Sequence, residues 1–229
     1  MHIDLNFQDG QTLLFNKPKH WTSFDVVKKV RRIVKVKKVG HAGTLDPLAT
    51  GLLILCTGKH TKQITAIQEL DKEYELVFKL GATTPSYDAE FPEENIKDAS
   101  HISPTDIEEA LKGFRGGIVQ MPPIFSAVKI DGKRAYKFAR KGKEVQLRPR
   151  WVTVHQFDLL NTDSLDAVQA KVRCSKGTYI RSLVHDLGQV LGVGGYIREL
   201  TRTRIGTHRL QDAWEIADFE REVKAERGG

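Results

Sequence analysis

The chain has 229 residues, of which 40% are hydrophobic and 28% are charged, a balance typical of a folded globular domain. Its 36 Lys and Arg residues outnumber its 29 Asp and Glu residues, which gives a formal net charge of +7. No stretch approaches the roughly 18 apolar residues of a membrane span, and the opening MHIDLNFQDG lacks the apolar core of a signal peptide, so we expect a cytoplasmic protein without a membrane anchor.

The first predicted helix begins at Thr22 or Ser23, either of which can cap it. Its apolar positions recur at helical spacing and are Val26, Val27, Val30, Ile33 and Val34. Residues 28–38 hold seven basic residues and no acid, and the basic residues of the helix fall outside the apolar stripe.

The segment GHAGTLDPLATG, residues 40–51, contains a single carboxylate, Asp46, directly before Pro47. Pro47 biases Asp46 towards an extended backbone, and the apolar run GLLILCTG that follows predicts a buried strand. An ordinary Asp–Pro turn and a rigidly held functional carboxylate both fit this pattern. No GxxxxGK[ST], HExxH or CxxC motif occurs, so we expect no phosphate loop, metal site or cofactor.

Two regular elements are predicted in the middle of the chain. Residues 73–80 alternate between polar and apolar, which predicts a strand with Tyr74 on its apolar face. Ser103 and Pro104 open a helix that glycines close from Gly113 onwards. The apolar stripe of this helix consists of Ile107, Ala110, Leu111 and Phe114.

An irregular basic segment near residues 121–150 follows, opened by Met-Pro-Pro. Residues 129–150 hold nine basic residues against Asp131 and Glu144, an excess equal to the net charge of the whole chain. We expect a hairpin or a helix carried on a long loop.

The last predicted elements are a strand at residues 168–174 and a helix that ends at Gly188. The helix stripe is Ile180, Leu183, Val184 and Leu187. Cys56 and Cys174 each lie in a β-like apolar stretch, so we interpret them as buried reduced thiols, with a disulfide as the alternative. No repeat or low-complexity linker occurs, which favours one mixed α+β domain.

A third basic cluster lies near the end of the sequence and consists of Arg198, Arg202, Arg204 and Arg209. Any one cluster could be ordinary solvated surface. Three clusters on an otherwise nearly neutral chain favour a polyanionic partner, because phosphates release counterions when Lys and Arg bind them.

Several motifs resemble, in order, those of the TruB family of tRNA pseudouridine synthases, which isomerise a uridine in the T-loop at tRNA position 55. They are NKPKHWTSFDVVKKVR, GHAGTLDPLATGLLILCTGKHTK, KEYE, QMPPIFSAVKIDGKRAYKFARKG, CSKGTYIRSLVHDLG and LTRTRIG, and together they span most of residues 12–206. The resemblance implies the pseudouridine-synthase fold, a mixed and largely antiparallel sheet flanked by helices, with residues 121–150 as a mobile thumb-like insertion.

The same resemblance implies the catalytic residues. Asp46 matches the nucleophile and Arg181 matches its cationic partner, which would favour the ionised carboxylate. Tyr74 matches the tyrosine under the flipped base and a candidate for proton transfer, although a core tyrosine is the alternative. The carboxylate either traps C1′ or assists formation of a glycal, and the sequence leaves both routes open.

The resemblance also implies the residues that bind the RNA. Tyr179 and Leu200 match contacts to the uracil, and His41 matches the histidine that fills the base stack after the nucleotide is flipped out. The candidates for contacts to the RNA backbone are Lys133, Arg134, Lys137, Arg140 and Arg202. The expected partner is the T-arm of tRNA, with no obligate protein partner.

Two features depart from the family pattern. His20 stands where the motif K-P-x-G-x-T-S usually has glycine, which puts the local backbone in question. About twenty residues follow LTRTRIG, so we expect one catalytic domain over residues 1–229 and no C-terminal RNA-binding domain. Two other functions stay open: an RNA-binding or RNA-folding module without catalysis, and a pseudouridine synthase that acts on another RNA.

Overall fold

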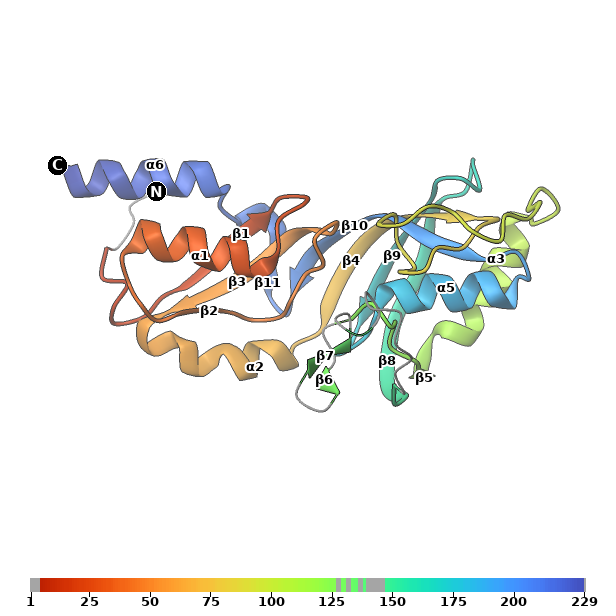
Figure 1. The fold of residues 1–229 in the computed structure, drawn as a ribbon, viewed down its shortest axis with the longest axis horizontal. Helices are drawn as coiled ribbons and strands as arrows, with labels where there is room; N and C mark the ends of the chain where they lie inside the picture. The colour runs from red at the N-terminus through yellow and green to blue at the C-terminus, as the bar shows by residue number, and fades with distance from the viewer. Residues whose placement is uncertain (1–4, 127–128, 131–132, 136–137, 139–146, 229) are drawn as a thin grey trace. The chain divides into compact units, whose positions relative to one another are not determined.

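The structure is a computed structural model that describes residues 5–126, 129–130, 133–135, 138 and 147–228. The chain divides into two compact units, Met1–Tyr74 with Leu200–Gly229, and Glu75–Glu199. As Figure 1 shows, the chain leaves the first unit along strand β4 (Lys72–Leu80) and returns to it along strand β10 (Gly195–Ile205). No helix among the described residues is both long and apolar enough to cross a bilayer.

The strands form a mixed sheet in the order β1-β3-β10-β4-β9-β8-β5, with β2 paired to β3 and β11 paired to β10. Their bounds are β1 Thr12–Lys17, β2 Val39–His41, β3 Thr50–Thr57, β5 Gly116–Gln120, β8 Arg150–Asn161, β9 Val168–Cys174 and β11 His208–Arg209. Strands β3 and β10 pair in parallel, whereas β1–β3, β2–β3, β5–β8 and β8–β9 are antiparallel. This sheet and its flanking helices confirm the predicted α+β class.

In the first unit, helix α1 (Ser23–Val34) begins as predicted. The Thr22 hydroxyl accepts from the Asp25 amide while the Asp25 carboxylate accepts from the Thr22 amide, a reciprocal cap that satisfies two donors of the first turn. All five residues of the predicted stripe are buried, in a cluster that also contains Phe15 from β1 and Phe219. The stripe therefore fixes which face of α1 covers the sheet.

Two further helices, α2 (Ile64–Glu69) and α6 (Ile216–Gly228), belong to the same unit. Near the end of α6, Arg227 donates to the carbonyls of Ile33 at 2.7 Å and Val34 at 2.9 Å. These are carbonyls of the last turn of α1, which lack partners within that helix. Helix α6 thus provides donors for two carbonyls at the end of α1.

The second unit contains α3 (Pro104–Leu111) and α5 (Ile180–Val190). Helix α3 begins at the predicted Ser103–Pro104 and has a capping box with Asp106. The predicted end of α5 at Gly188 is wrong, because the helix continues to Val190. A Cβ on Gly188 would lie 2.2 Å from the Gly194 carbonyl carbon, so this glycine allows a close backbone approach instead of ending the helix.

The predicted alternation of β4 and β9 is confirmed, with Tyr74, Leu76, Phe78 and Leu80 buried on one face of β4, and Val168, Ala170, Val172 and Cys174 buried on one face of β9. Cys56 and Cys174 are both buried free thiols, as predicted. Short 3-10 helices complete the described elements at η1 Gly58–Gln63, η2 Lys112–Phe114 and η3 Leu210–Asp212.

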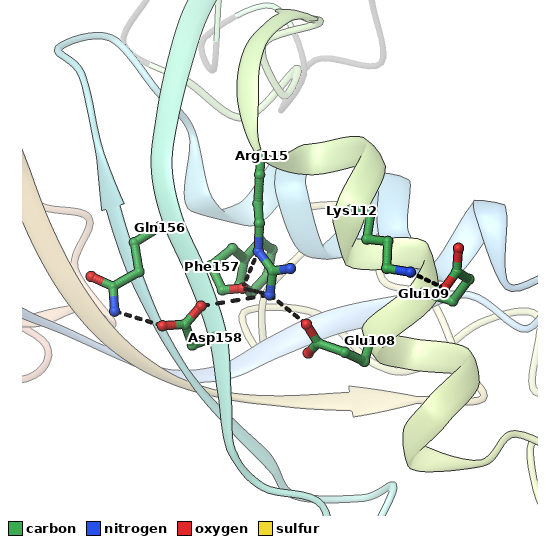
Figure 2. Close-up of polar contacts among 7 residues, drawn as sticks. All are labelled: Glu108, Glu109, Lys112, Arg115, Gln156, Phe157 and Asp158. Carbon is green, nitrogen blue, oxygen red and sulfur yellow. Dashed lines mark hydrogen bonds and ion pairs between the residues drawn. The ribbon is translucent and has the colours of Figure 1, made fainter.

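Arg115 organises the polar contacts beside strand β8, as Figure 2 shows. Pairing of β5 with β8 begins at Gly116 and Val154, so β8 extends past that partner. The Arg115 guanidinium donates twice to the Phe157 carbonyl, at 3.1 and 2.7 Å, and also binds Glu108 at 2.6 Å. The Arg115 side chain thus satisfies the Phe157 carbonyl on the stretch of β8 that extends past β5.

In the predicted basic segment, β6 (Lys129–Ile130) and β7 (Lys133–Arg134) pair antiparallel, and Ala135 and Phe138 have helical conformation. The described residues thus include parts of both predicted alternatives, the hairpin and the helix. Lys137 and Arg140 lie outside the described residues, and so do the side chains of Lys133 and Arg134. Their contacts with RNA stay a prediction.

Candidate active site

Asp46 is half-buried on the loop between β2 and β3, and Arg202 of β10 holds the backbone before it. The Arg202 guanidinium donates to the carbonyls of Gly43 at 3.2 Å and Thr44 at 3.3 Å. It also donates to Leu52 at 2.8 Å, and the side chain is 1% exposed. The prediction that Arg202 contacts the RNA backbone is wrong, because its guanidinium is buried and donates to carbonyls of the protein.

Arg202 reaches this position because β3 and β10 approach closely. Thr201 and Arg202 are the register partners of Thr50 and Gly51. A Cβ on Gly51 would lie 2.4 Å from the Arg202 carbonyl oxygen, and its φ of +100° favours glycine. Gly51, which follows the Asp46 loop, therefore allows the close pairing of β3 with β10, and this pairing positions Arg202.

Side chains and backbone groups of the first unit fix the two residues that flank Asp46. The Ser23 hydroxyl, buried in the first turn of α1, accepts from the Leu45 amide at 2.9 Å and donates to the Leu45 carbonyl at 3.2 Å. After Asp46, the Pro47 carbonyl accepts from the His20 amide at 2.7 Å. The carboxylate therefore stands on a backbone that is anchored on both sides.

Lys17, the last residue of β1, is the second buried cation beside this loop. Its Nζ donates to the carbonyls of Pro18 at 2.9 Å, Trp21 at 2.6 Å and Pro47 at 3.3 Å, and the residue is fully buried. Burial lowers the pKa of Lys17 to about 8, and the Asp46 carboxylate opposes that shift by favouring the charged ammonium. Lys17 and Asp46 thus interact electrostatically within the first unit.

The other residues predicted for the first unit lie in its strands. His41 is half-buried and pairs with Leu55 across β2 and β3. Leu200 is half-buried in β10, and Tyr74 lies on the buried face of β4 at 9% exposure. Burial at this level fits a core tyrosine as well as a ring beneath a base, so both interpretations of Tyr74 remain.

Arg181 lies in the first turn of α5, in the second unit, and is 5% exposed. Its guanidinium donates to the carbonyls of Ser86 at 2.7 Å and Phe125 at 2.8 Å. The Arg181 Nε also lies 3.6 Å from an oxygen of Asp88, itself a buried carboxylate. Asp46 and Arg181 belong to different units, and their predicted pairing stays a prediction.

Tyr179 precedes α5 and is held through its backbone by Gln120 at the end of β5. The Gln120 side chain accepts from the Tyr179 amide at 2.7 Å and donates to the Tyr179 carbonyl at 3.0 Å. One turn into the helix, the Ser182 hydroxyl donates to the Met121 carbonyl at 2.8 Å. These contacts fix where α5 starts, and with it the positions of Tyr179 and Arg181.

Sequence reasoning missed the residues that support the site. Lys17 could have been found, because Leu13, Phe15 and Lys17 alternate along β1 and the alternation places Lys17 on the buried face. Asp88 and Gln120 lie in a loop and at a strand end, where no periodic pattern distinguishes them from exposed polar residues.

Two family models together match most of the chain. A model of the TruB family pseudouridylate synthase (N terminal domain) matches residues 31–180, and a model of the tRNA pseudouridylate synthase B C-terminal domain matches residues 181–227. The two models meet inside α5, so their boundary does not coincide with the limits of the compact units. The single-domain organisation stays a prediction.

Two solved structures are similar to the whole chain. One is the crystal structure of a Cbf5-Nop10-Gar1 complex, with a TM-score of 0.74 and 29% sequence identity, covering 98% of this chain and 58% of that chain. The other is the structure of an H/ACA RNP bound to a substrate RNA containing 2'-deoxyuridine, with a TM-score of 0.72 and 26% identity, covering 97% and 56%. The chain thus spans little more than half of these structural neighbours.

Curated relatives match over nearly their full length. Proteins named tRNA pseudouridine synthase B are 48% identical over 221 residues in Phocaeicola vulgatus, covering 94% of each chain, and 51% identical over 224 residues in Parabacteroides distasonis, covering 94% of this chain and 95% of the relative. The relative of the same name in Flavobacterium johnsoniae is 44% identical over 225 residues, covering 95% and 98%. On the extent of these matches, the chain belongs to the TruB family of pseudouridine synthases.

Proposed function

We propose that this chain isomerises uridine to pseudouridine at position 55 in the T-loop of tRNA, with Asp46 as the catalytic carboxylate. The observation that carries the proposal is the anchoring of the Asp46 loop, in which Arg202 and Ser23 hold the backbone before the carboxylate and Lys17 holds it afterwards. A group held by buried contacts needs little reorganisation at the moment of reaction. The protein acts in the cytoplasm, where its tRNA substrate is.

The reaction needs one anionic group beside the sugar and the base. The bond between N1 and C1′ breaks, the uracil turns, and a bond between C5 and C1′ forms while C5 loses its proton and N1 gains one. No electrons are exchanged, and every atom of the uridine is retained apart from exchange with water. In one route the Asp46 carboxylate adds to C1′, and in the other it assists departure of the base and formation of a glycal.

The remaining site residues have supporting roles in the proposal. Arg181 pairs with Asp46 and favours the ionised carboxylate. Tyr74 lies under the flipped uracil and is the candidate for proton transfer, while Tyr179 and Leu200 contact the base. His41 fills the stack that the nucleotide leaves, which offsets part of the few kcal/mol that flipping costs.

The basic segment near residues 121–150 supplies contacts to phosphate in this proposal, through Lys133, Arg134, Lys137 and Arg140. Exposed cations on α1 and at its C-cap, such as Lys28, Arg32 and Lys35, add to the positive surface of the chain. Such contacts position an RNA without reading its sequence.

The test compares wild type with Asp46→Asn on T-arm RNA that carries tritium at C5 of uridine. Wild type should release tritium, whereas Asp46→Asn should release none and should bind the RNA within about tenfold of wild type, because the change removes a charge and almost no volume. Asp9→Asn is the matched control, since Asp9 is an exposed carboxylate of the same unit, paired with Lys59.

The outcomes separate the alternatives. Turnover by Asp46→Asn at the wild-type rate would overturn the role of Asp46. RNA binding by wild type without any tritium release would favour the non-catalytic RNA-binding or RNA-folding module. Mapping pseudouridine in unfractionated RNA to a nucleotide other than position 55 would favour a synthase for another RNA.

A further inference from the structure

The loop that holds Arg181 contains a tyrosine in an unusual backbone conformation. Tyr87 lies between Ser86 and Asp88, the two loop residues that contact the Arg181 guanidinium, and its φ is +64°. A non-glycine residue adopts this left-handed region at a steric cost, so the conformation persists only where surrounding contacts impose it.

One of those contacts is an aromatic stack. The Tyr87 ring and the His185 ring lie 3.7 Å apart between centroids, with an interplanar angle of 11°. Both residues are half-buried, and burial lowers the pKa of His185 and raises the pKa of Tyr87. Both rings are therefore uncharged near neutral pH, and they stack as two neutral aromatic faces.

The stack and the Arg181 contacts come from the same face of α5. Arg181 and His185 are four residues apart, which places them one above the other on the helix. Arg181 contacts Ser86 and Asp88, while His185 contacts the residue between them. Three consecutive loop residues are thus bound by two positions of one helix face.

Backbone contacts continue the connection into β10 and the loop itself. The Tyr87 carbonyl accepts from the Ile197 amide at 3.0 Å, and the Thr84 hydroxyl donates to the Asp88 carbonyl at 2.6 Å. The Asp88 carboxylate accepts from the Ser86 hydroxyl at 2.5 Å. These hydrogen bonds and the stack together hold residues 84–88, which include the groups that contact Arg181.

We propose that Tyr87 is a positioning residue for Arg181, and that its stack on His185 holds the Ser86 carbonyl and the Asp88 carboxylate where they orient the guanidinium. Tyr87 acts through Arg181 and touches no reacting atom. The inference rests on the proposed function, in which Arg181 serves catalysis.

The experiment measures the single-turnover rate with saturating T-arm RNA, together with RNA affinity, for paired variants. Tyr87→Gly keeps the left-handed backbone without strain and removes the ring, so it should slow the rate by about tenfold or more and change affinity by less than about threefold. Tyr87→Phe retains the stack and should recover most of that loss. His185→Ala removes the other ring of the stack and should slow the rate as Tyr87→Gly does. His185→Phe retains an aromatic ring and should recover most of that loss.

The double variant Tyr87→Gly/His185→Ala should lose no more than either single variant, because each removes the same contact. Asn95→Gly is the matched control, since Asn95 is exposed in the same unit and also has a positive φ, of 49°. This control should keep the wild-type rate.

A Tyr87→Gly variant that turns over at the wild-type rate would overturn the inference, and so would equal losses in Tyr87→Gly and Tyr87→Phe. Circular dichroism checks that each variant folds, and if Tyr87→Gly does not, the His185 pair decides by the same criteria. If wild type is active and Tyr87→Gly has the same single-turnover rate, this inference is refuted and the proposed function is not. Wild type without turnover on any tRNA refutes the proposed function and the inference with it.

Discussion

The backbone amide of His20 donates to the carbonyl of Pro47 at 2.7 Å, so the residue that replaces the family's glycine contacts the residue directly after Asp46. The φ of His20 is +68°, in the left-handed region that glycine adopts freely. The backbone expected for glycine is therefore kept in this chain, with a histidine side chain that strains it.

His20→Gly should consequently stabilise the protein. A non-glycine residue in this region costs about 1–2 kcal/mol, of which glycine's greater freedom in the unfolded chain offsets part, leaving a gain of about 0.5–1 kcal/mol in the free energy of unfolding. Urea denaturation measures it. Lys19→Gly, at the neighbouring exposed residue without a positive φ, should lower the same free energy, and equal effects of both changes would contradict the strain.

Arg202→Met should destabilise the first unit by about 3 kcal/mol, because three carbonyls lose a buried donor. Arg209→Met, an exposed member of the same cluster, should change stability by less than about 0.5 kcal/mol. Equal effects of the two substitutions on thermal unfolding would show that the buried contacts of Arg202 contribute nothing to stability.

The basic segment should determine the salt dependence of RNA binding. Neutralising Lys133, Arg134, Lys137 and Arg140 together should flatten the log–log slope by about 0.7–0.9 for each lost phosphate contact. Arg202→Met should leave the slope unchanged, since its guanidinium is buried. An unchanged slope in the four-residue variant would exclude phosphate contacts from this segment.

Arg181→Met should slow single turnover more than it weakens binding if Arg181 pairs with Asp46. Loss of a positive charge beside the catalytic carboxylate should lower the single-turnover rate by about tenfold or more and change RNA affinity by less than about threefold. Arg181→Lys should be intermediate, because it keeps the charge but loses the planar fork.

Arg181→Met also leaves Asp88 without this cation, so lost stability must be separated from lost catalysis. The double variant Arg181→Met/Asp88→Asn removes that buried charge and should recover stability without recovering the rate. A normal single-turnover rate in Arg181→Met would exclude Arg181 as the partner of Asp46.

Asp186→Asn should raise stability at neutral pH. Burial raises the pKa of Asp186 from 3.8 to about 6, so between those values the folded chain binds more protons than the unfolded chain. The penalty of the buried carboxylate is therefore fully present above pH 6 and is relieved as the pH falls. The stability difference between Asp186→Asn and wild type should shrink from pH 7 to pH 4, and a constant difference in urea titrations would contradict the raised pKa.

Arg115→Met should lower the free energy of unfolding by about 1–2 kcal/mol, since the Phe157 carbonyl loses both of its contacts with the guanidinium (Figure 2). Lys112→Met is the control, because Lys112 and Glu109 form an exposed pair that contributes less than about 0.5 kcal/mol. Similar losses for the two variants in urea denaturation would show that the β8 contact adds no stability.

Periodicity predicted the elements whose burial is set by one face, such as α1 with its capping residue Thr22 and β4 with its alternating face. It failed where a residue serves a contact distant in sequence. Gly188 resembles a helix stop but makes room for Gly194, and Arg202 resembles a surface cation but binds carbonyls about 150 residues away. The spacing of residues along the chain does not predict these contacts, because they form only in the tertiary structure.

In the candidate site, too, some residues could be predicted from the sequence and others could not. The motif around Asp46 predicted which carboxylate to consider, whereas the residues that anchor it were found only in the structure. Lys17 follows from strand alternation once β1 is known to have a buried face. Asp88 could not be predicted, because its role depends on a helix some ninety residues later.

The hydrogen bonds from Arg227 to the end of α1 have a consequence for synthesis on the ribosome. Residues 75–199 form an uninterrupted unit, but the other unit needs both the first 74 residues and residues 200–229. Helix α1 is capped locally by Lys35, but the carbonyls of Ile33 and Val34 receive the Arg227 donors only after α6 has been synthesised. All residues of the second unit are therefore synthesised before residues 200–229, whereas the unit that carries Asp46 is completed only after α6 has left the exit tunnel.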